Sequence, residues 1–163
     1  MRTDGAVPVV ETKLLTAFEQ SYSNYTRAGT LAKGWFRAPA TGNYKFYMSC
    51  DDACKLFLDA NKFDKSAPVE PTREQIAVRH WATGWRNYLI VPDESDSNQY
   101  QSEWIPMEVG EFYSMEGFML EYTGSDHFTV SVEFEQADTD GHHHANREVQ
   151  ILSIDPENVE EKY

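Results

Sequence analysis

The chain has 163 residues, 40% of them hydrophobic and 13% aromatic, so it is long and apolar enough to fold as one domain with a substantial core. Its formal net charge of −13 argues against nucleic acid as a partner, because binding phosphates requires a basic face. The apolar runs are too short to cross a bilayer, and the start MRTDGAVPVV lacks the apolar region of a signal peptide, so we expect no membrane insertion and either a cytosolic protein or a piece excised from a larger one.

The N-terminal part of the chain shows helical periodicity. Within residues 12–22, apolar side chains recur at helical spacing and predict a short amphipathic helix; they are Leu14, Leu15, Phe18 and Tyr22. We assign residues 1–27, lead-in and helix, to the same domain as the rest of the chain. Asn24 begins the triplet Asn-Tyr-Thr, a glycosylation sequon that adds a little to an extracellular assignment.

From residue 28 onward the apolar period changes to two, which is typical of strands. GWFRAPATGNYKFYMSC predicts strand, turn and strand, KLFLD alternates again, and DHFTVSVEFEQ has the clearest alternation. Many short strands with regular turns predict an all-β fold, an antiparallel two-sheet β-sandwich of the jelly-roll kind, over residues 28–154. The polar segment around His142–His144 predicts a loop before a last strand, EVQILSI. We expect these histidines to be structural or solvated; a zinc site is the alternative, although adjacent histidines on a strand diverge. Residues 155–163 read as an acidic tail or linker.

The only two cysteines, Cys50 and Cys54, are four residues apart. An even count at close spacing favours a small disulfide loop in an oxidising compartment. Free thiols and metal thiolates are the alternatives, although a structural zinc site needs four ligands.

Between the cysteines lie two adjacent acids, Asp51 and Asp52. Their repulsion must be offset by water, by a cation or by a role in catalysis. Consecutive side chains of a strand point to opposite faces, so both could hold one ion only where the backbone departs from regular strand geometry. The alternative is a type I turn with both carboxylates solvated. A glycosidase would pair Asp51 with an acid such as Glu103 or Asp126, but no catalytic motif is present, and we expect no enzyme.

Two blocks of the sequence resemble the β-sandwich domain named after the anthrax protective antigen, the PA-fourteen domain. The first is GWFRAPATGNYKFYMSCDDACKLFLD, which matches an aromatic strand, AP-x-T-G-x-Y-x-F, a Ser-Asp-Asp-like stretch and an L-x-L-D strand. The second is MEVGEFYSMEGFMLEYTGSDHFTVSVEF, similar to the family's later segment. The cysteines around the aspartates and HHHANREVQ resemble the version found in fibrocystin-like surface proteins.

The resemblance implies a secreted or cell-surface protein and, in the family's adhesin branch, a calcium site. There the paired aspartates, joined by a cis peptide, bind Ca²⁺, which in turn holds sugar hydroxyls. Carried over by position, Asp51 and Asp52 are metal and ligand-binding residues, and the late loop TGSDHF supplies Asp126 as a further metal ligand, with Ser125 and His127 at the ligand. The adhesins use an Asn in a longer loop there, so this last assignment departs from the family pattern.

Aromatic residues are the remaining candidates for contact with a sugar, because their faces pack against the C–H faces of pyranoses. The alternative for such residues in a sandwich is the core. Trp85, beside Gly84, is the best exposed candidate in a set formed by Trp81, Trp85, Tyr88, Trp104 and Tyr113.

Together these features predict an extracellular adhesion module that recognises glycans with Ca²⁺. The alternative is a structural spacer or assembly domain that contacts neighbouring domains or copies at the cell surface.

Overall fold

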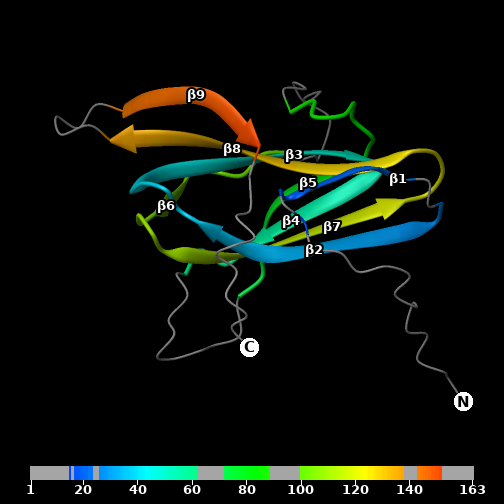
Figure 1. Ribbon diagram of the computed structural model, residues 1–163, viewed down its shortest axis with the longest axis horizontal. Helices are drawn as coiled ribbons and strands as arrows, with labels where there is room; N and C mark the ends of the chain where they lie inside the picture. The colour runs from blue at the N-terminus through cyan, green and yellow to red at the C-terminus, as the bar shows by residue number, and fades with distance from the viewer. Residues whose placement is uncertain are drawn as a thin grey trace, which may run out of the picture.

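The computed structural model describes residues 15, 17–23, 26–61, 72–88, 100–137 and 143–151. All the regular structure in these residues is β, in two antiparallel sheets that face one another (Figure 1). The fold class predicted from the sequence is therefore confirmed. Within the same residues, no helix is long and apolar enough to cross a membrane.

One sheet has five strands and the other has four. The five-stranded sheet has the order β1-β8-β3-β6, with β9 also paired to β8. Its strands are β1 (Glu19–Ser23), β3 (Gly42–Asp51), β6 (Ile105–Met107), β8 (Asp126–Ala137) and β9 (His143–Ile151). The four-stranded sheet has the order β2-β7-β4-β5. Its strands are β2 (Ala28–Arg37), β4 (Ala53–Leu58), β5 (Glu74–Arg79) and β7 (Phe112–Glu121).

The helix expected near the N-terminus is wrong where the structure describes it. Glu19–Ser23 forms β1 and pairs with the start of β8, Glu19 opposite Thr129 and Gln20 opposite Phe128. Phe18 and Gln20 are buried, so burial follows the period of a strand. The gain from pairing with β8 and from placing Phe18 in the core overrides the helical spacing of the apolar residues. Residues 12–14 and the sequon residue Asn24 lie outside the described residues.

The expected loop around the histidines is also partly wrong. β9 begins at His143, and its pairing with β8 places His143 opposite Ala137 and His144 opposite Gln136. The last strand thus starts five residues before the predicted EVQILSI segment.

The core lies between the sheets and is rich in aromatic residues. In β3 the inward residues Tyr44, Phe46 and Met48 are at most 1% exposed, and full burial of each such side chain stabilises by about 1.5–3 kcal/mol. Phe18 and Phe128 meet edge to face with ring centroids 6.0 Å apart. Gly117 of β7 faces these two rings, and a Cβ there would overlap both, so the position requires a residue without a side chain.

The outer faces of the two sheets differ. Segment 80–88 packs on the outer face of the five-stranded sheet through Thr83 and Tyr88, and the outward residues Ser49 and Thr129 that they contact are fully buried. Segment 100–102 instead pairs with the backbone of β3 at the edge of this sheet. The four-stranded sheet leaves apolar residues exposed on its outer face, namely Leu31, Trp35 and Leu120 at 42–53%.

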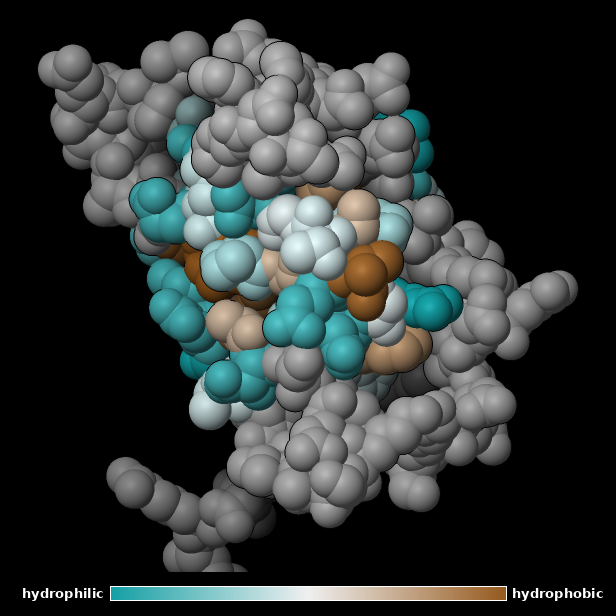
Figure 2. Space-filling model, turned by 90° about the vertical axis from the view of Figure 1, so that its left-hand side faces the viewer, coloured by the Kyte–Doolittle hydropathy of each residue, from teal (hydrophilic) through white to brown (hydrophobic). Residues whose placement is uncertain are grey.

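Figure 2 views the end of the sandwich where β2 ends and β3 and β7 begin; there hydrophilic residues surround separate, small hydrophobic areas.

A candidate cation and ligand site

The opposite end of the sandwich holds the corner between β3 and β4. β3 ends at Asp51 and β4 begins at Ala53, and the Asp51–Asp52 peptide bond is cis. Cys50 and Cys54 are joined by a disulfide and are 0% and 2% exposed, so the chain's only cysteines lie in the core and close the corner from inside. This resolves the alternatives left open for the cysteines.

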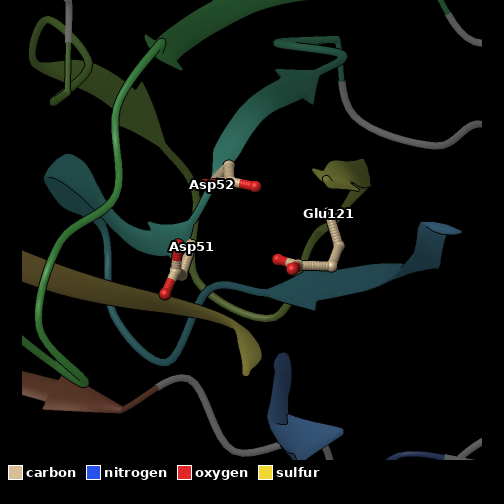
Figure 3. A group of neighbouring side chains, drawn as sticks. All are labelled: Asp51, Asp52 and Glu121. Carbon is tan, nitrogen blue, oxygen red and sulfur yellow. The ribbon is translucent and has the colours of Figure 1, made fainter. Parts of the chain in front are cut away.

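Three carboxylates meet at this corner (Figure 3). Asp51 and Asp52 are joined by Glu121, the last residue of β7, and the ligand oxygens of the three lie within 4.8 Å of one another. Glu121 extends from the neighbouring strand toward the two aspartates. We call Asp51, Asp52 and Glu121 the carboxylate cluster. The two aspartates are partly exposed, whereas Glu121 is only 3% exposed.

Glu121 is the most informative member of the cluster. It occupies the inward position that follows Tyr113, Met115, Gly117 and Met119 in the alternation of β7. Neither of its carboxylate oxygens has a hydrogen-bond partner among the described residues, although both are buried. A buried polar group without a partner costs about 1–3 kcal/mol, and more when it is charged. Glu121 therefore needs either a proton or a cation.

The electrostatics of the cluster point the same way. Burial is the largest cause that raises the pKa of Asp51, followed by the charge of Asp52, a hydrogen bond with Asp52 and the charge of Asp126. Burial also raises the pKa of Glu121, and the charges of Asp52, Asp51 and Asp126 add to it. Asp51 and Glu121 are thus harder to ionise than solvated acids, first because they are buried and second because other acids lie nearby. A cation between the carboxylates would remove this penalty.

Backbone contacts hold the cluster in place. The amide of Tyr122, directly after Glu121, donates a 2.8 Å hydrogen bond to Asp52 Oδ2. The amide of Asp52 donates to the Leu120 carbonyl at 3.3 Å. The β3–β4 corner is therefore bonded to the end of β7 on both sides of Glu121, and the three acids come from segments whose relative positions are fixed.

The late loop contributes less than the sequence predicted. Ser125 is exposed in the segment between β7 and β8 and is not part of the cluster. Asp126 lies close enough to raise the pKa values of Asp51 and Glu121, but it is 1% exposed and accepts a hydrogen bond of 3.2 Å from Gln20 Nε2. The role of Asp126 as a metal ligand stays a prediction. Sequence reasoning missed Glu121, although an acid at an inward strand position was a signal that could have found it.

His127 and Trp85 lie beside the cluster but differ in access. His127 is opposite Asp51 in the pairing of β3 with β8 and is 1% exposed, so it is not open to a ligand. Its Nε2 lies 3.3 Å from Ser49 Oγ, and burial lowers the pKa of its imidazole. Trp85 is partly buried, with its ring 5.5 Å from that of His127.

The other aromatic candidates are dispersed. Tyr88 and Tyr113 are buried, Trp104 packs under the ammonium group of Lys45, and only Trp81, at 71%, is widely exposed. The five aromatic residues singled out in the sequence therefore do not form one platform.

The donor set of the cluster fits a hard divalent cation. Calcium takes six to eight oxygen ligands, mostly carboxylates, backbone carbonyls and water. Three converging carboxylates without a cysteine or histidine suit calcium better than zinc or copper, which prefer nitrogen and sulfur. The orphaned, buried carboxylate of Glu121 is the structural observation that this fit explains.

Comparisons with known proteins extend to fold only. No family model matches the chain, and no curated protein matches it. Among solved structures, the chain is similar to the epithelial adhesin 6 A domain from Candida glabrata, in complex with Galβ1-3GlcNAc, at 14% identity and a TM-score of 0.47, covering 77% of this chain and 48% of that one. It is also similar to the epithelial adhesin 9 A domain from the same organism, in complex with Galβ1-4GlcNAc, at 17% identity and a TM-score of 0.43, covering 64% and 43%. The chain thus spans less than half the length of these adhesin chains.

Proposed function

We propose that this protein is an extracellular adhesion module that binds glycans through a calcium ion held by Asp51, Asp52 and Glu121. The observation that carries the proposal is the buried carboxylate of Glu121, which has no hydrogen-bond partner in the part of the chain that the structure describes and whose ligand oxygen lies within 4.8 Å of those of both aspartates. Structural acids in a core are normally paired or bonded. A buried acid that has no partner among the described residues and lies beside two other acids is the kind of ligand set that a divalent cation binds.

The bound ion would supply both charge neutralisation and recognition. Three carboxylates leave coordination positions of Ca²⁺ to be filled by carbonyls, water or hydroxyl groups. The exposed sides of Asp51 and Asp52 mark the direction from which sugar hydroxyls would approach. Glu121, being buried, would hold the ion from below and not touch the sugar.

The extracellular location is supported by the disulfide between Cys50 and Cys54. Disulfides persist in oxidising compartments and are rare in the cytosol. We infer that the module works at the cell surface or in a secreted protein, with glycans as its partners.

A glycan array probed in calcium and again in the chelator EGTA tests this function. We expect binding to a restricted set of glycans in calcium and none in EGTA. Asp52→Asn should lose this binding, whereas Glu74→Gln should keep it. Glu74 is an exposed acid of β5 opposite Leu58, at the end of β4 away from the cluster. Binding that is the same with and without chelator would refute a calcium-dependent lectin.

A second candidate function is supported by a different observation. The outer face of the four-stranded sheet exposes Leu31, Trp35 and Leu120, and exposed apolar surface often marks an interface with another protein. An assembly or spacer module that uses this face would show self-association in light scattering, lost in Leu31→Lys. A protein that is monomeric at high concentration and binds glycans favours the first function.

A further inference from the structure

We propose that Tyr22, on β1, is the residue that stacks against the apolar face of the bound sugar, and that Trp85 and His127 serve to hold its ring. This inference rests on the proposed glycan-binding function. It names a contact residue that the sequence patterns did not indicate, since the spacing of Tyr22 had suggested the apolar face of a helix.

Tyr22 presents an open aromatic ring at the end of the sandwich that carries the carboxylate cluster. Its side chain is 59% exposed, although the ring is in contact with two others. It lies tilted by 32° against the ring of Trp85 at a centroid distance of 5.4 Å, and edge-on to His127 at 5.5 Å. A large ring that is held on one side and open on the other has the geometry needed to stack on a ligand.

Trp85 is less free to do this. Besides Tyr22 and His127, it has the guanidinium of Arg86 over its ring, 5.2 Å from the centroid. Its surroundings are therefore occupied by three neighbours, and it is only partly exposed. Because the ring of Tyr22 is more exposed than that of Trp85, the structure favours Tyr22 as the ring that contacts the ligand and Trp85 as the ring that supports it.

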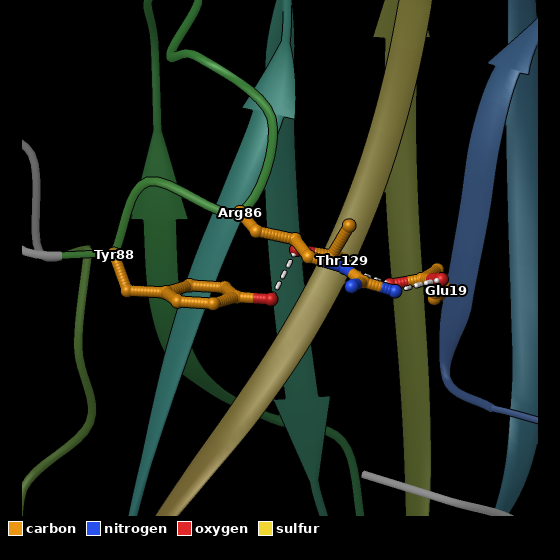
Figure 4. Close-up of polar contacts among 4 residues, drawn as sticks. All are labelled: Glu19, Arg86, Tyr88 and Thr129. Atoms are coloured by element: carbon orange, nitrogen blue, oxygen red, sulfur yellow. Dashed lines mark hydrogen bonds and ion pairs between the residues drawn. The ribbon is translucent and has the colours of Figure 1, made fainter. Parts of the chain in front are cut away.

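The two residues that support Tyr22, Trp85 and His127, are themselves held in place by hydrogen bonds. His127 is buried and lies within 3.3 Å of Ser49 Oγ in β3. The segment that carries Trp85 is tied to the five-stranded sheet by two hydrogen bonds of 3.0 and 2.9 Å from Arg86 to Glu19, and by a 2.6 Å bond between Tyr88 and Thr129 (Figure 4). Because Glu19 belongs to β1, these bonds also connect Trp85 to the strand of Tyr22.

The pairing of the strands brings the backbone of β1 to within two strands of Asp51, because β8 lies between β1 and β3. Asp51 is opposite His127 in the β3–β8 ladder, and Ser23, after Tyr22, is opposite Asp126 in the β1–β8 ladder. Directly opposite residues of an antiparallel pair have Cα atoms about 4.5–5.5 Å apart. Two such steps, about 10 Å, separate Asp51 from β1. We infer that a pyranose bound to an ion at Asp51 can extend across this span, with its C–H face toward Tyr22.

The test compares Tyr22→Ala with Tyr22→Phe by calorimetric titration in calcium. The probes are the methyl glycosides of galactose, glucose, mannose and N-acetylglucosamine. We expect Tyr22→Ala to weaken binding of the recognised glycoside by about three- to tenfold, and Tyr22→Phe to bind as the wild type does. Calcium affinity measured without sugar should be the same in all three proteins, which separates stacking from ion binding.

The matched control is Trp35→Ala, which removes an exposed aromatic residue from the outer face of the other sheet and should leave glycoside affinity unchanged. If Tyr22→Ala melts at a lower temperature, Tyr22→Leu replaces it as the ring-free variant. Wild-type affinity in a folded ring-free variant overturns the inference and leaves the proposed function intact. A wild type that binds none of the glycosides and nothing on the glycan array removes the proposed function, and the inference with it.

Discussion

Asp52 accepts a 2.8 Å hydrogen bond at Oδ2 from the backbone amide of Tyr122, a residue 70 positions further along the chain. The bond connects the corner between β3 and β4 to the end of β7, where Glu121 directly precedes Tyr122. It orients the Asp52 carboxylate and at the same time fixes the backbone that carries Glu121. Three acids are thus held together by the architecture, and the energy of their repulsion has to be compensated by something that the fold itself does not supply.

Calcium should stabilise the wild-type protein against heat, and Glu121→Gln should abolish most of that effect. An ion that binds only the folded state at about a hundred times its Kd adds about 2.7 kcal/mol to the free energy of unfolding. Melting curves in calcium and in EGTA measure it. Glu74→Gln serves as the control and should respond to calcium like the wild type. Equal calcium responses in wild type and Glu121→Gln would mean that Glu121 is not a ligand.

The stability of the calcium-free protein should depend on pH with a sign set by the carboxylate cluster. The pKa values of Asp51 and Glu121 are raised in the folded protein, first by burial and then by neighbouring acids. Between the ordinary pKa of an unfolded acid, about 4, and these raised values, the folded state binds more protons than the unfolded one. The contribution of these groups to stability is therefore lowest at neutral pH and grows as the pH falls through the raised values.

Urea unfolding of wild type and Glu121→Gln in EGTA, at several pH values from neutral to about 4, isolates this contribution from that of the other acids. We expect the variant to be at least as stable as the wild type at neutral pH, and its relative advantage to shrink with acidification. In calcium the trend should reverse, because the ion requires ionised carboxylates. A difference between the two proteins that does not change with pH would argue against a repelling cluster.

Removing the disulfide with Cys50→Ala and Cys54→Ala should lower the stability by about 2 kcal/mol, because the closed loop is short. The corner that carries Asp51 and Asp52 would then lose its covalent closure, so calcium affinity should fall as well. Calorimetry on the double variant at a temperature where it is folded measures the second effect. An unchanged calcium affinity would show that the hydrogen bonds around Asp52 suffice to shape the corner.

The variant Thr83→Val tests whether the segment after β5 is held in place by its polar contacts with β3. Its hydroxyl accepts a 3.0 Å hydrogen bond from the Cys50 amide and lies 2.9 Å from Ser49 Oγ, all in buried surroundings. Thr83→Val keeps the shape but removes this acceptor, and should destabilise by about 1–3 kcal/mol. Thr41→Val removes an exposed bond from the Val109 amide and should change stability by no more than about 0.5 kcal/mol. Similar losses in the two variants would contradict the buried network.

The sequence predicted the regular part of the fold well, because alternation in β3 and β8 reports directly on which side chains face the core. It also indicated the two aspartates and the cysteines, since these are adjacent in the chain. Glu121 was missed because its meaning depends on a neighbour almost 70 residues away. β1 was misread because a short apolar segment can follow either period, and only its pairing with β8 decides between them.

Tyr22 and Trp85 are a second example of a contact between distant residues that the sequence pattern does not predict. They are 63 residues apart in the chain, yet their rings meet at 5.4 Å only because one lies on β1 and the other in the segment anchored over β8. Aromatic residues can be counted in a sequence, but whether each is core or surface follows from the cover that the rest of the chain provides. Tyr88 and Tyr113, which the sequence grouped with Trp85 as candidates for contact with a sugar, are both buried.

We propose that Asp51, Asp52 and Glu121 together hold one calcium ion. Isothermal titration of calcium into metal-free protein measures this most directly. We expect one ion bound per chain in the wild type, and strongly weakened binding in Asp52→Asn and in Glu121→Gln while both variants remain folded. Heat signals no different from dilution in the wild type, or an affinity that survives both substitutions, would contradict it.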